Sequence, residues 1–400
     1  MMINQQFRAN FPFFERSPEW VYLDSAATTL KPKVLIEATN DFYCSAGSVH
    51  RSQYDFAQTQ AYEKARDLVA KRFNVASREN VVWTSGTTHA INLVANGIEH
   101  LLQEDDEIVI TVAEHHANFI PWQQLAERRQ AKLIVLPLDE NGQIDPALLR
   151  DRLSDRTKIV AFHLISNVTG VRQPAEALVK LIRQYSPAMV LIDMAQAVCC
   201  EAVDVQQIGA DFYAFSAHKM YGPTGVGALI GNEAKLAEIR PLVYGGKMLK
   251  SVSERHLELA ELPYRLEAGT PNIAGIIGFG KVLEWLNGWD FVALNQSLKT
   301  LLDYAYKRLD FLENVRILGR KAYLTSTISF VVDGIHHADI AAIMAERQIA
   351  LRSGEHCAKP YLRYLSQAGT LRISLAHYNQ QQDIDTFIEA LIFAIDLLKE

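Results

Sequence analysis

The sequence lacks the features that mark a membrane protein, a secreted protein or a nucleic-acid-binding protein. No apolar run is long enough to span a bilayer as a helix. The first twenty residues lack the basic, apolar and small-residue segments of a secretory signal. Acidic residues outnumber basic ones, 46 to 40, and a net charge of −6 argues against nucleic acid or an anionic membrane as the main partner. We therefore expect a cytoplasmic protein with neither of those partners.

Cysteine is scarce, and its spacing excludes the usual zinc motifs. The four cysteines stand at 44, 199, 200 and 357, with no C-x-x-C pair, so we predict no metal site. Cys199 and Cys200 end an apolar run, which indicates buried thiols of low reactivity. Cys357 lies among basic residues, a setting that favours a reactive thiolate. A free thiol without function is equally compatible with the local sequence.

The 400 residues, 49% of them hydrophobic, can bury a large core and are long enough for two domains. Apolar runs of strand length alternate with helical patterns; the runs cover 81–83, 107–112, 132–136, 158–165, 189–192 and 212–216. Such an alternation predicts an α/β fold with a mostly parallel sheet covered on both faces. Later, helical patterns at 301–312 and 340–346 flank short strands at 326–332 and 370–375. We predict a large domain over residues 17–285 and a smaller α+β domain over residues 286–400, with residues 1–16 packed on the smaller one.

Polar residues follow several of these predicted strands, at the sheet edge where α/β proteins bind ligands. Thr87 and Thr88 begin a helix after Gly86, an arrangement suited to a phosphate, although an ordinary threonine cap gives the same pattern. His115 and His116 point to different sides of the backbone, so a shared metal is disfavoured. One of them can face a pocket to stack on a ring or move a proton, and a hydrogen-bonded loop histidine is the alternative.

A carboxylate and a lysine complete this set of strand-end residues. Asp193 closes an apolar strand, where an unpaired carboxylate is costly and a protonated ring nitrogen would be a good partner. Lys219 follows the run 212–216 and precedes a glycine-rich turn, with Ser216 and His218 beside it as further phosphate donors. Together these groups form the set that pyridoxal 5'-phosphate (PLP) requires, with Lys219 as the Schiff-base lysine. A solvent-directed lysine and an internal ion pair for Asp193 are the alternatives.

Longer motifs make the chain similar to a known family. They are YLDSAATTLKP (22–32), SVHRS (48–52), GTTHAINLVA (86–95), EHHANFIPW (114–122), SNVTG (166–170), IDMAQA (192–197), SAHKMYGPTGVGAL (216–229), EAGTPN (267–272), RSGEHCAKP (352–360) and LRISLAHYN (371–379). The chain resembles the class V aminotransferase family and, within it, the group II cysteine desulfurases of the SufS/CsdA type, with the CsdA type nearest. The resemblance implies the type I fold of PLP-dependent transferases, with a seven-stranded, mostly parallel sheet in the large domain and the cysteine loop in the small one.

The resemblance also implies roles for individual residues. Those implied for the cofactor are Lys219 for the Schiff base, Asp193 for the pyridine nitrogen, Gln196 for the ring hydroxyl, His116 for stacking on the ring, and Thr87, Thr88, Ser216 and His218 for the phosphate. Thr270 is implied to reach the phosphate of a second subunit, and therefore a homodimer. Those implied for the substrate are Arg372, Asn167 and His50. Independently of the family, Arg372 faces away from the apolar side of its strand, and its fork suits a carboxylate.

The reaction that the resemblance implies is the conversion of L-cysteine to L-alanine. Lys219 removes the α-proton, His116 relays protons, and the Cys357 thiolate takes the sulfur as a persulfide for a small acceptor protein of the SufE/CsdE type, as in iron–sulfur cluster assembly. Three positions depart from the commoner pattern: Ala217, Glu355 and Lys359. Glu355 lies close enough to Cys357 to oppose the thiolate. Selenocysteine lyase activity, an aminotransferase of other specificity and a non-catalytic scaffold are the alternatives.

Overall fold

The structure is a computed structural model that describes residues 2–45, 47–50, 56–319 and 324–399. Its largest element is a seven-stranded sheet with the order β2-β8-β7-β6-β5-β3-β4. The strands are β2 (Val81–Thr84), β3 (Glu107–Thr111), β4 (Lys132–Leu136), β5 (Thr157–His163), β6 (Met189–Asp193), β7 (Phe212–Ser216) and β8 (Gly227–Gly231). Within this sheet β8 runs against its two neighbours and the other pairs are parallel. The predicted mostly parallel, seven-stranded α/β architecture is confirmed.

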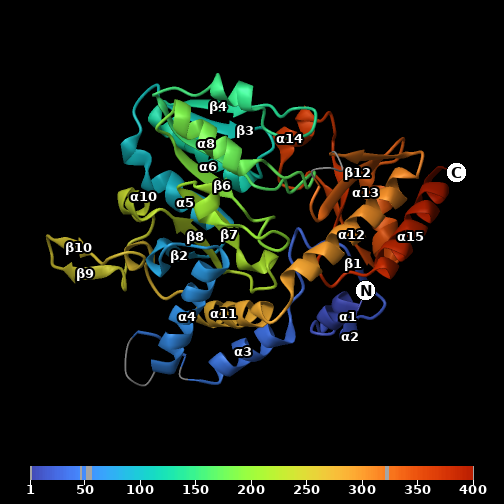
Figure 1. The fold of residues 1–400 in the computed structure, drawn as a ribbon, viewed down its shortest axis with the longest axis horizontal. Coiled ribbons are helices and arrows are strands. Elements are labelled where there is room, and N and C mark those ends of the chain that lie inside the picture. The colour runs from blue at the N-terminus through green and yellow to red at the C-terminus, as the bar shows by residue number, and fades with distance from the viewer. Residues whose placement is uncertain (1, 46, 51–55, 320–323, 400) are drawn as a thin grey trace.

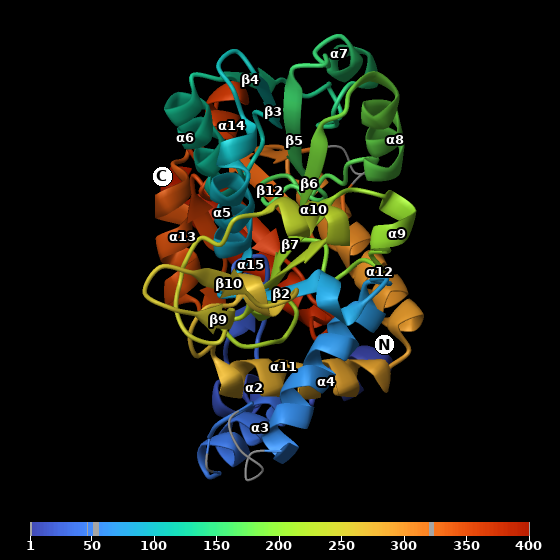
Figure 2. The same ribbon diagram turned by 90° about the vertical axis from the view of Figure 1, so that its left-hand side faces the viewer.

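Both faces of this sheet are buried, which explains why its strands are apolar throughout. Ile108 and Ile110 pack into one core beneath α5 (Thr87–Gly97) and α6 (Ile120–Arg129). Val109, on the same strand, belongs to the core on the other face, beneath α8 (Ala175–Tyr185). Successive side chains of a strand alternate between faces, so both alternating sets must be apolar. Figure 2 shows α5 and α6 on one side of the strands and α8 on the other.

A second, antiparallel sheet, of which β12 is labelled in Figure 1, lies towards the C-terminus. Its strand order is β11-β12-β15-β14. Its strands are β11 (Val315–Leu318), β12 (Thr327–Val332), β14 (Arg352–Gly354) and β15 (Thr370–Ser374), and helices α12 (Phe291–Asp310), α13 (His337–Glu346) and α15 (Gln381–Lys399) pack on it. The core between them also takes in Val21 and Leu23, because β1 (Val21–Tyr22) pairs with β13 (Ile349–Ala350). These two side chains therefore pack against the smaller sheet and its helices.

The N-terminal helix α1 (Met2–Arg8) contacts both parts of the chain. Arg8 donates to the carbonyl oxygen of Tyr378 and pairs with Asp383 in the C-terminal region, whereas Phe7 belongs to the larger core. The boundary near residue 285 stays a prediction. Further elements are α2 (Phe13–Arg16), α3 (Lys33–Tyr43), α4 (Phe56–Arg72), α7 (Pro146–Arg150), α9 (Val205–Ile208), α10 (Glu233–Glu238), α11 (Ile273–Asn287), α14 (Lys359–Tyr364) and the projecting hairpin of β9 (Leu249–Val252) and β10 (Leu257–Leu259). Across the described ranges, no helix is both long enough and apolar enough to cross a membrane.

Candidate active site

A cavity of about 380 Å³ opens at the carboxyl ends of the central strands. His163 ends β5, Asp193 ends β6 and Ser216 ends β7, so three adjacent parallel strands bring polar side chains to one edge. The cavity is lined by Ala26, Ala27, Thr87, Thr88, His115, Ala117, His163, Ile165, Asn167, Asp193, Ala195, Gln196, Ser216, His218, Lys219, Arg352, Ser353, His356, Cys357 and Arg372. Most of the predicted site residues therefore meet here, drawn from both the large sheet and the C-terminal part of the chain.

Lys219 lies in a short 3-10 turn, Ala217–Lys219, directly after β7. Burial lowers the pKa of its ammonium from 10.5 to about 8, with Arg372 acting in the same direction and the Asp193 carboxylate opposing both. An unprotonated amine is a nucleophile and a base, so a lysine with this pKa presents far more of its reactive form near neutral pH than an exposed lysine does.

Asp193 is buried at the same edge of the sheet. Burial raises the pKa of its carboxyl from 3.8 to about 6, opposed by a hydrogen bond from the Ala195 N–H (2.9 Å to Oδ1) and by Lys219. The neighbouring groups therefore do not fully offset the cost of burying the negative charge of Asp193, and this carboxylate is suited to pair with a cationic group of a ligand. Gln196 lines the cavity nearby and donates its side-chain N–H to the carbonyl oxygen of Ala26 (3.0 Å).

Helix α5 directs its N-terminus at the cavity. Gly86 precedes it with φ 149°, and a Cβ there would lie 3.1 Å from the Ser216 hydroxyl oxygen. The Thr87 N–H donates to that oxygen (2.9 Å), while the buried Nδ1 of His218 has no hydrogen-bond partner within the described part of the chain. The N-terminus of α5, the hydroxyls of Thr87 and Ser216 (2.8 Å apart) and this imidazole nitrogen form a good cradle for an anion such as phosphate.

The structure differs from the sequence prediction in which of the two adjacent histidines faces the cavity. His115 lines it, and its Nδ1 accepts a hydrogen bond from the Ala117 N–H (3.0 Å). Burial, with the charges of Lys219 and His116, lowers the pKa of His115 to about 4, so its ring is neutral. His116 points out of the cavity, and its Nε2 accepts a hydrogen bond from the Lys359 N–H (3.2 Å). Neighbouring residues face different sides of the backbone, so one of the two histidines lines the cavity and the other does not.

Arg372, on β15, reaches the cavity from the smaller sheet and is 4% exposed. Its Nη1 donates to the carbonyl oxygen of Asn167 (2.8 Å), its Nη2 pairs with Asp24 Oδ1 (3.2 Å), and its Nε has no partner among the described residues. Burial lowers the pKa of Arg372, and Asp24 opposes this effect. Asp24 also pairs with Arg352 (3.4 Å), which lines the cavity, so two guanidinium groups share one carboxylate and leave a surplus of positive charge for an anionic substrate.

Cys357 is exposed and lines two spaces. One is the cavity, and the other is an outer groove of about 430 Å³ in which His116 and Ile120 also take part. Glu355 pairs with Lys359 (Oε1–Nζ 3.1 Å), so two of the departures from the family pattern compensate each other's charge. Cys199 lies away from both spaces, and burial raises the pKa of its thiol to about 11.

His50 and Thr270 do not reach the cavity of their own chain. The Nε2 of His50 lies 3.0 Å from Glu63 Oε1, and Thr270 is exposed. Positions 51 and 52 of the SVHRS motif lie outside the described residues. The roles predicted for His50 and Thr270 stay predictions.

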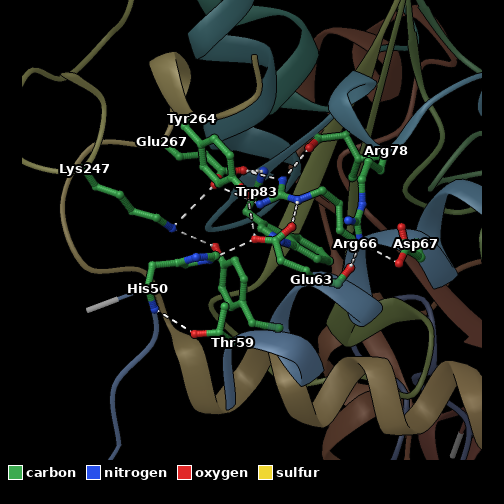
Figure 3. A network of polar contacts seen from close by, with 12 residues as sticks. His50, Thr59, Glu63, Arg66, Asp67, Arg78, Trp83, Lys247, Tyr264 and Glu267 are labelled. Atoms are coloured by element: carbon green, nitrogen blue, oxygen red, sulfur yellow. Dashed lines mark hydrogen bonds and ion pairs between the residues drawn. The ribbon is translucent and has the colours of Figure 1, made fainter. Parts of the chain in front are cut away.

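The surroundings of His50 form a buried network of charges, shown in Figure 3. Arg66 has no exposed surface, donates to both carboxylate oxygens of Glu267 (2.7 and 3.1 Å) and pairs with Glu63 (3.1 Å). Glu267 Oε1 also accepts the backbone N–H of Trp83 (2.7 Å) on β2. The network therefore fixes the start of the 267–272 segment, which carries Thr270, to the large sheet.

Sequence reasoning missed a buried pair beside Asp193. His163 lies opposite Asp193 in the register of β5 and β6, and its Nδ1 lies 2.8 Å from Glu114 Oε1. The Thr111 hydroxyl and the Asn118 side-chain N–H donate to the same carboxylate (both 2.6 Å). Burial of the imidazole lowers the pKa of His163, but the Glu114 carboxylate outweighs it and the net direction is upward. A polar residue ending an otherwise apolar strand was the available signal.

Comparisons with known proteins agree on one family. The Aminotransferase class-V family matches residues 21–387. A probable cysteine desulfurase of Haemophilus influenzae is 50% identical over 399 residues, covering 100% of this chain and 91% of that protein. The crystal structure of the cysteine desulfurase CsdA of Escherichia coli matches with a TM-score of 0.93 at 41% identity, covering 98% of each chain. An apo cysteine desulfurase of Thermococcus onnurineus matches with a TM-score of 0.94 at 34% identity, covering 99% of each chain.

Proposed function

The chain belongs to the aminotransferase class-V family, and we propose that it is a PLP-dependent cysteine desulfurase that converts L-cysteine to L-alanine and leaves the sulfur as a persulfide on Cys357. The observation that carries the proposal is the convergence of Lys219, Asp193, Arg372 and Cys357 on one cavity. A base, a partner for a ring nitrogen, a carboxylate receptor and a thiol acceptor are the four groups that such a reaction requires.

The residues present fit PLP. The unpartnered His218 Nδ1 and the N-terminus of α5 suit its phosphate, and the buried Asp193 suits its ring nitrogen. The residues that would hold it are Lys219, Asp193, Gln196, Thr87, Thr88, Ser216 and His218, with His115 rather than His116 against the ring. When bound, PLP supplies an electron-withdrawing ring that stabilises negative charge at the substrate's α-carbon.

The remaining work belongs to the protein's side chains. Arg372, helped by Asn167, receives the substrate carboxylate and sets the orientation of the α-carbon. Lys219, with its pKa lowered to about 8, takes the α-proton on Nζ. Because His115 Nδ1 accepts a backbone N–H, its proton lies on Nε2, from which it can be donated to the carbon that loses the sulfur.

Sulfur transfer is then a displacement at the substrate's sulfur. The Cys357 thiolate forms an S–S bond, the substrate's carbon–sulfur bond breaks, and its electron pair stays on the carbon side, where protonation yields alanine. The enzyme is left with a persulfide on Cys357, so no external oxidant is needed. Since Cys357 also lines the outer groove, a small sulfur-acceptor protein of the SufE/CsdE type can reach it from solution.

The proposal includes a cytoplasmic homodimer in which Thr270 contributes to the phosphate site of the second subunit. The exposure of Thr270 and the anchoring of its segment by Arg66 and Glu267 support this arrangement. L-selenocysteine is a second candidate substrate, because the same groups would act on it.

The test is alanine release by the purified holoenzyme with L-cysteine, in the wild type, Lys219→Ala and Cys357→Ser. We expect alanine from the wild type alone. Alanine released at the full rate by Cys357→Ser, with L-cysteine or L-selenocysteine, would contradict persulfide formation and indicate a lyase. Transfer of the amino group to an added keto acid, without sulfur release, would indicate an aminotransferase of other specificity. Failure to bind PLP would indicate a non-catalytic scaffold.

A further inference from the structure

The histidine that points out of the cavity contacts the cysteine segment at two places. The His116 backbone N–H donates to the carbonyl oxygen of Cys357 (2.7 Å), and its Nε2 accepts the backbone N–H of Lys359 (3.2 Å). His116 belongs to the large sheet's side of the molecule, in the turn His116–Asn118 after β3, whereas Cys357 follows β14 of the smaller sheet. These bonds therefore join two parts of the chain beside the thiol.

Helix α14, which begins two residues after Cys357, cannot cap its own first turn. Its cap residue is Ala358, which makes no side-chain cap hydrogen bond, and its second residue is Pro360, which has no N–H. The Lys359 N–H, at the start of the helix, therefore has no acceptor within its own helix, and such groups need one from elsewhere. His116 Nε2 supplies that acceptor from outside the helix.

The backbone at Cys357 is in a conformation that needs support from its surroundings. His356 has φ 52° and Cys357 has φ 54°, two consecutive non-glycine residues in the left-handed region. This region is unfavourable for residues with a Cβ and persists where neighbouring contacts enforce it. Asn167 donates to the carbonyl oxygen of His356 (2.7 Å), and His116 acts in the same way on the next carbonyl.

We propose that His116 is a positioning residue: its Nε2 caps helix α14 and thereby holds the Cys357 thiol at the wall of the cavity. His116 does not line the cavity, so it acts through Cys357. The imidazole must present a lone pair at Nε2, which requires its neutral form with the proton on Nδ1. The inference rests on the proposed function, because it concerns the delivery of this thiol to the substrate's sulfur.

Two substitutions distinguish the effect of the hydrogen-bond acceptor at Nε2 from the effect of the planar ring of His116. His116→Phe keeps a planar ring and removes the acceptor, whereas His116→Gln places an amide oxygen near the position of Nε2. Gln124→Ala is the matched control, because Gln124 lines the same outer groove and its side chain bonds Glu127 rather than the cysteine segment. Each variant is studied as the holoenzyme.

The first readout is hydrogen exchange of the Lys359 amide without substrate, and the second is the kcat and KM for alanine release from L-cysteine. In His116→Phe, loss of a cap predicts exchange about fivefold faster and a kcat about fivefold lower at unchanged KM. His116→Gln and Gln124→Ala should match the wild type in both. If His116→Phe showed the same Lys359 exchange rate and the same kcat as the wild type, the proposal would be overturned. It would also be overturned if His116→Gln exchanged as fast and turned over as slowly as His116→Phe. A wild type that releases no alanine would overturn the proposed function, while the exchange readout would still decide whether His116 is the cap.

Discussion

Removal of the Asp193 carboxylate should stabilise the apoenzyme while it weakens PLP binding. Burial raises the pKa of Asp193 from 3.8 to about 6, so at neutral pH the folded protein holds a charge that water would solvate better. At about 1.4 kcal/mol for each pKa unit, this difference amounts to about 3 kcal/mol. Asp193→Asn is nearly isosteric and keeps an oxygen that can accept the Ala195 N–H. We therefore expect apo Asp193→Asn to unfold with a free energy up to about 3 kcal/mol higher than the wild type at pH 7.5.

The sign of this effect depends on pH and on the cofactor. A carboxyl with a raised pKa in the folded state lowers stability above that pKa, and the loss fades as the pH falls from about 6 towards 3.8. The advantage of Asp193→Asn should therefore shrink at pH 5. With saturating PLP the order should reverse, because Asp193 would pair with a protonated ring nitrogen and tighter binding stabilises the folded state.

Urea unfolding of the apo and PLP-loaded proteins, followed by circular dichroism, measures both effects. Asp211→Asn is a suitable control, because Asp211 is also buried but accepts from Arg183 and the Val190 N–H (both 2.7 Å). That variant should be less stable than the wild type. If apo Asp193→Asn were destabilised like Asp211→Asn, the reasoning about an uncompensated functional carboxylate would be refuted.

Three further predictions follow from the same geometry. The rate at which PLP attaches to the apoenzyme should rise with pH around a midpoint near 8, the pKa of Lys219, in a stopped-flow absorbance series; a midpoint near 10.5 would contradict its burial. Arg66→Met should lower the free energy of unfolding by about 3–5 kcal/mol, because the buried Glu267 carboxylate loses its guanidinium partner and keeps a longer ion pair with Lys247 (3.8 Å). The double variant with Glu267→Gln should recover much of that loss in urea titrations, and a loss below about 1 kcal/mol would argue against the network. Arg372→Lys should raise the KM for L-cysteine about tenfold or more, whereas an unchanged KM would remove Arg372 from the carboxylate site.

The parts of the fold that could be predicted from the sequence are those in which burial leaves a continuous pattern. Strands such as β3 are apolar on both faces, so their runs stand out between helices. β8 (Gly227–Gly231) did not stand out, because its two glycines suggest a turn. α12 begins at Phe291, earlier than the predicted 301, because Asp290 caps it by accepting the Ala293 N–H (3.0 Å) ahead of a polar stretch.

The site residues that follow strand ends were predictable, and those fixed by contacts between distant segments were not. Asp193 and Lys219 stand at such ends and line the cavity. The choice between His115 and His116 depends on one residue of register, which a local pattern does not determine. The pairing of His163 with Glu114 joins residues 49 positions apart in the sequence; the polar His163 at the end of an apolar strand is a local signal, but nothing local identifies its partner.

The central claim is that sulfur from L-cysteine is transferred to Cys357. The most direct measurement is the mass of the peptide that contains Cys357, after the reduced holoenzyme has been mixed with L-cysteine and its thiols have been trapped by alkylation. We predict one added sulfur atom on Cys357, together with alanine, and none on Cys44, Cys199 or Cys200. Alanine formed without added sulfur on Cys357, or sulfur found on another cysteine instead, would contradict the account.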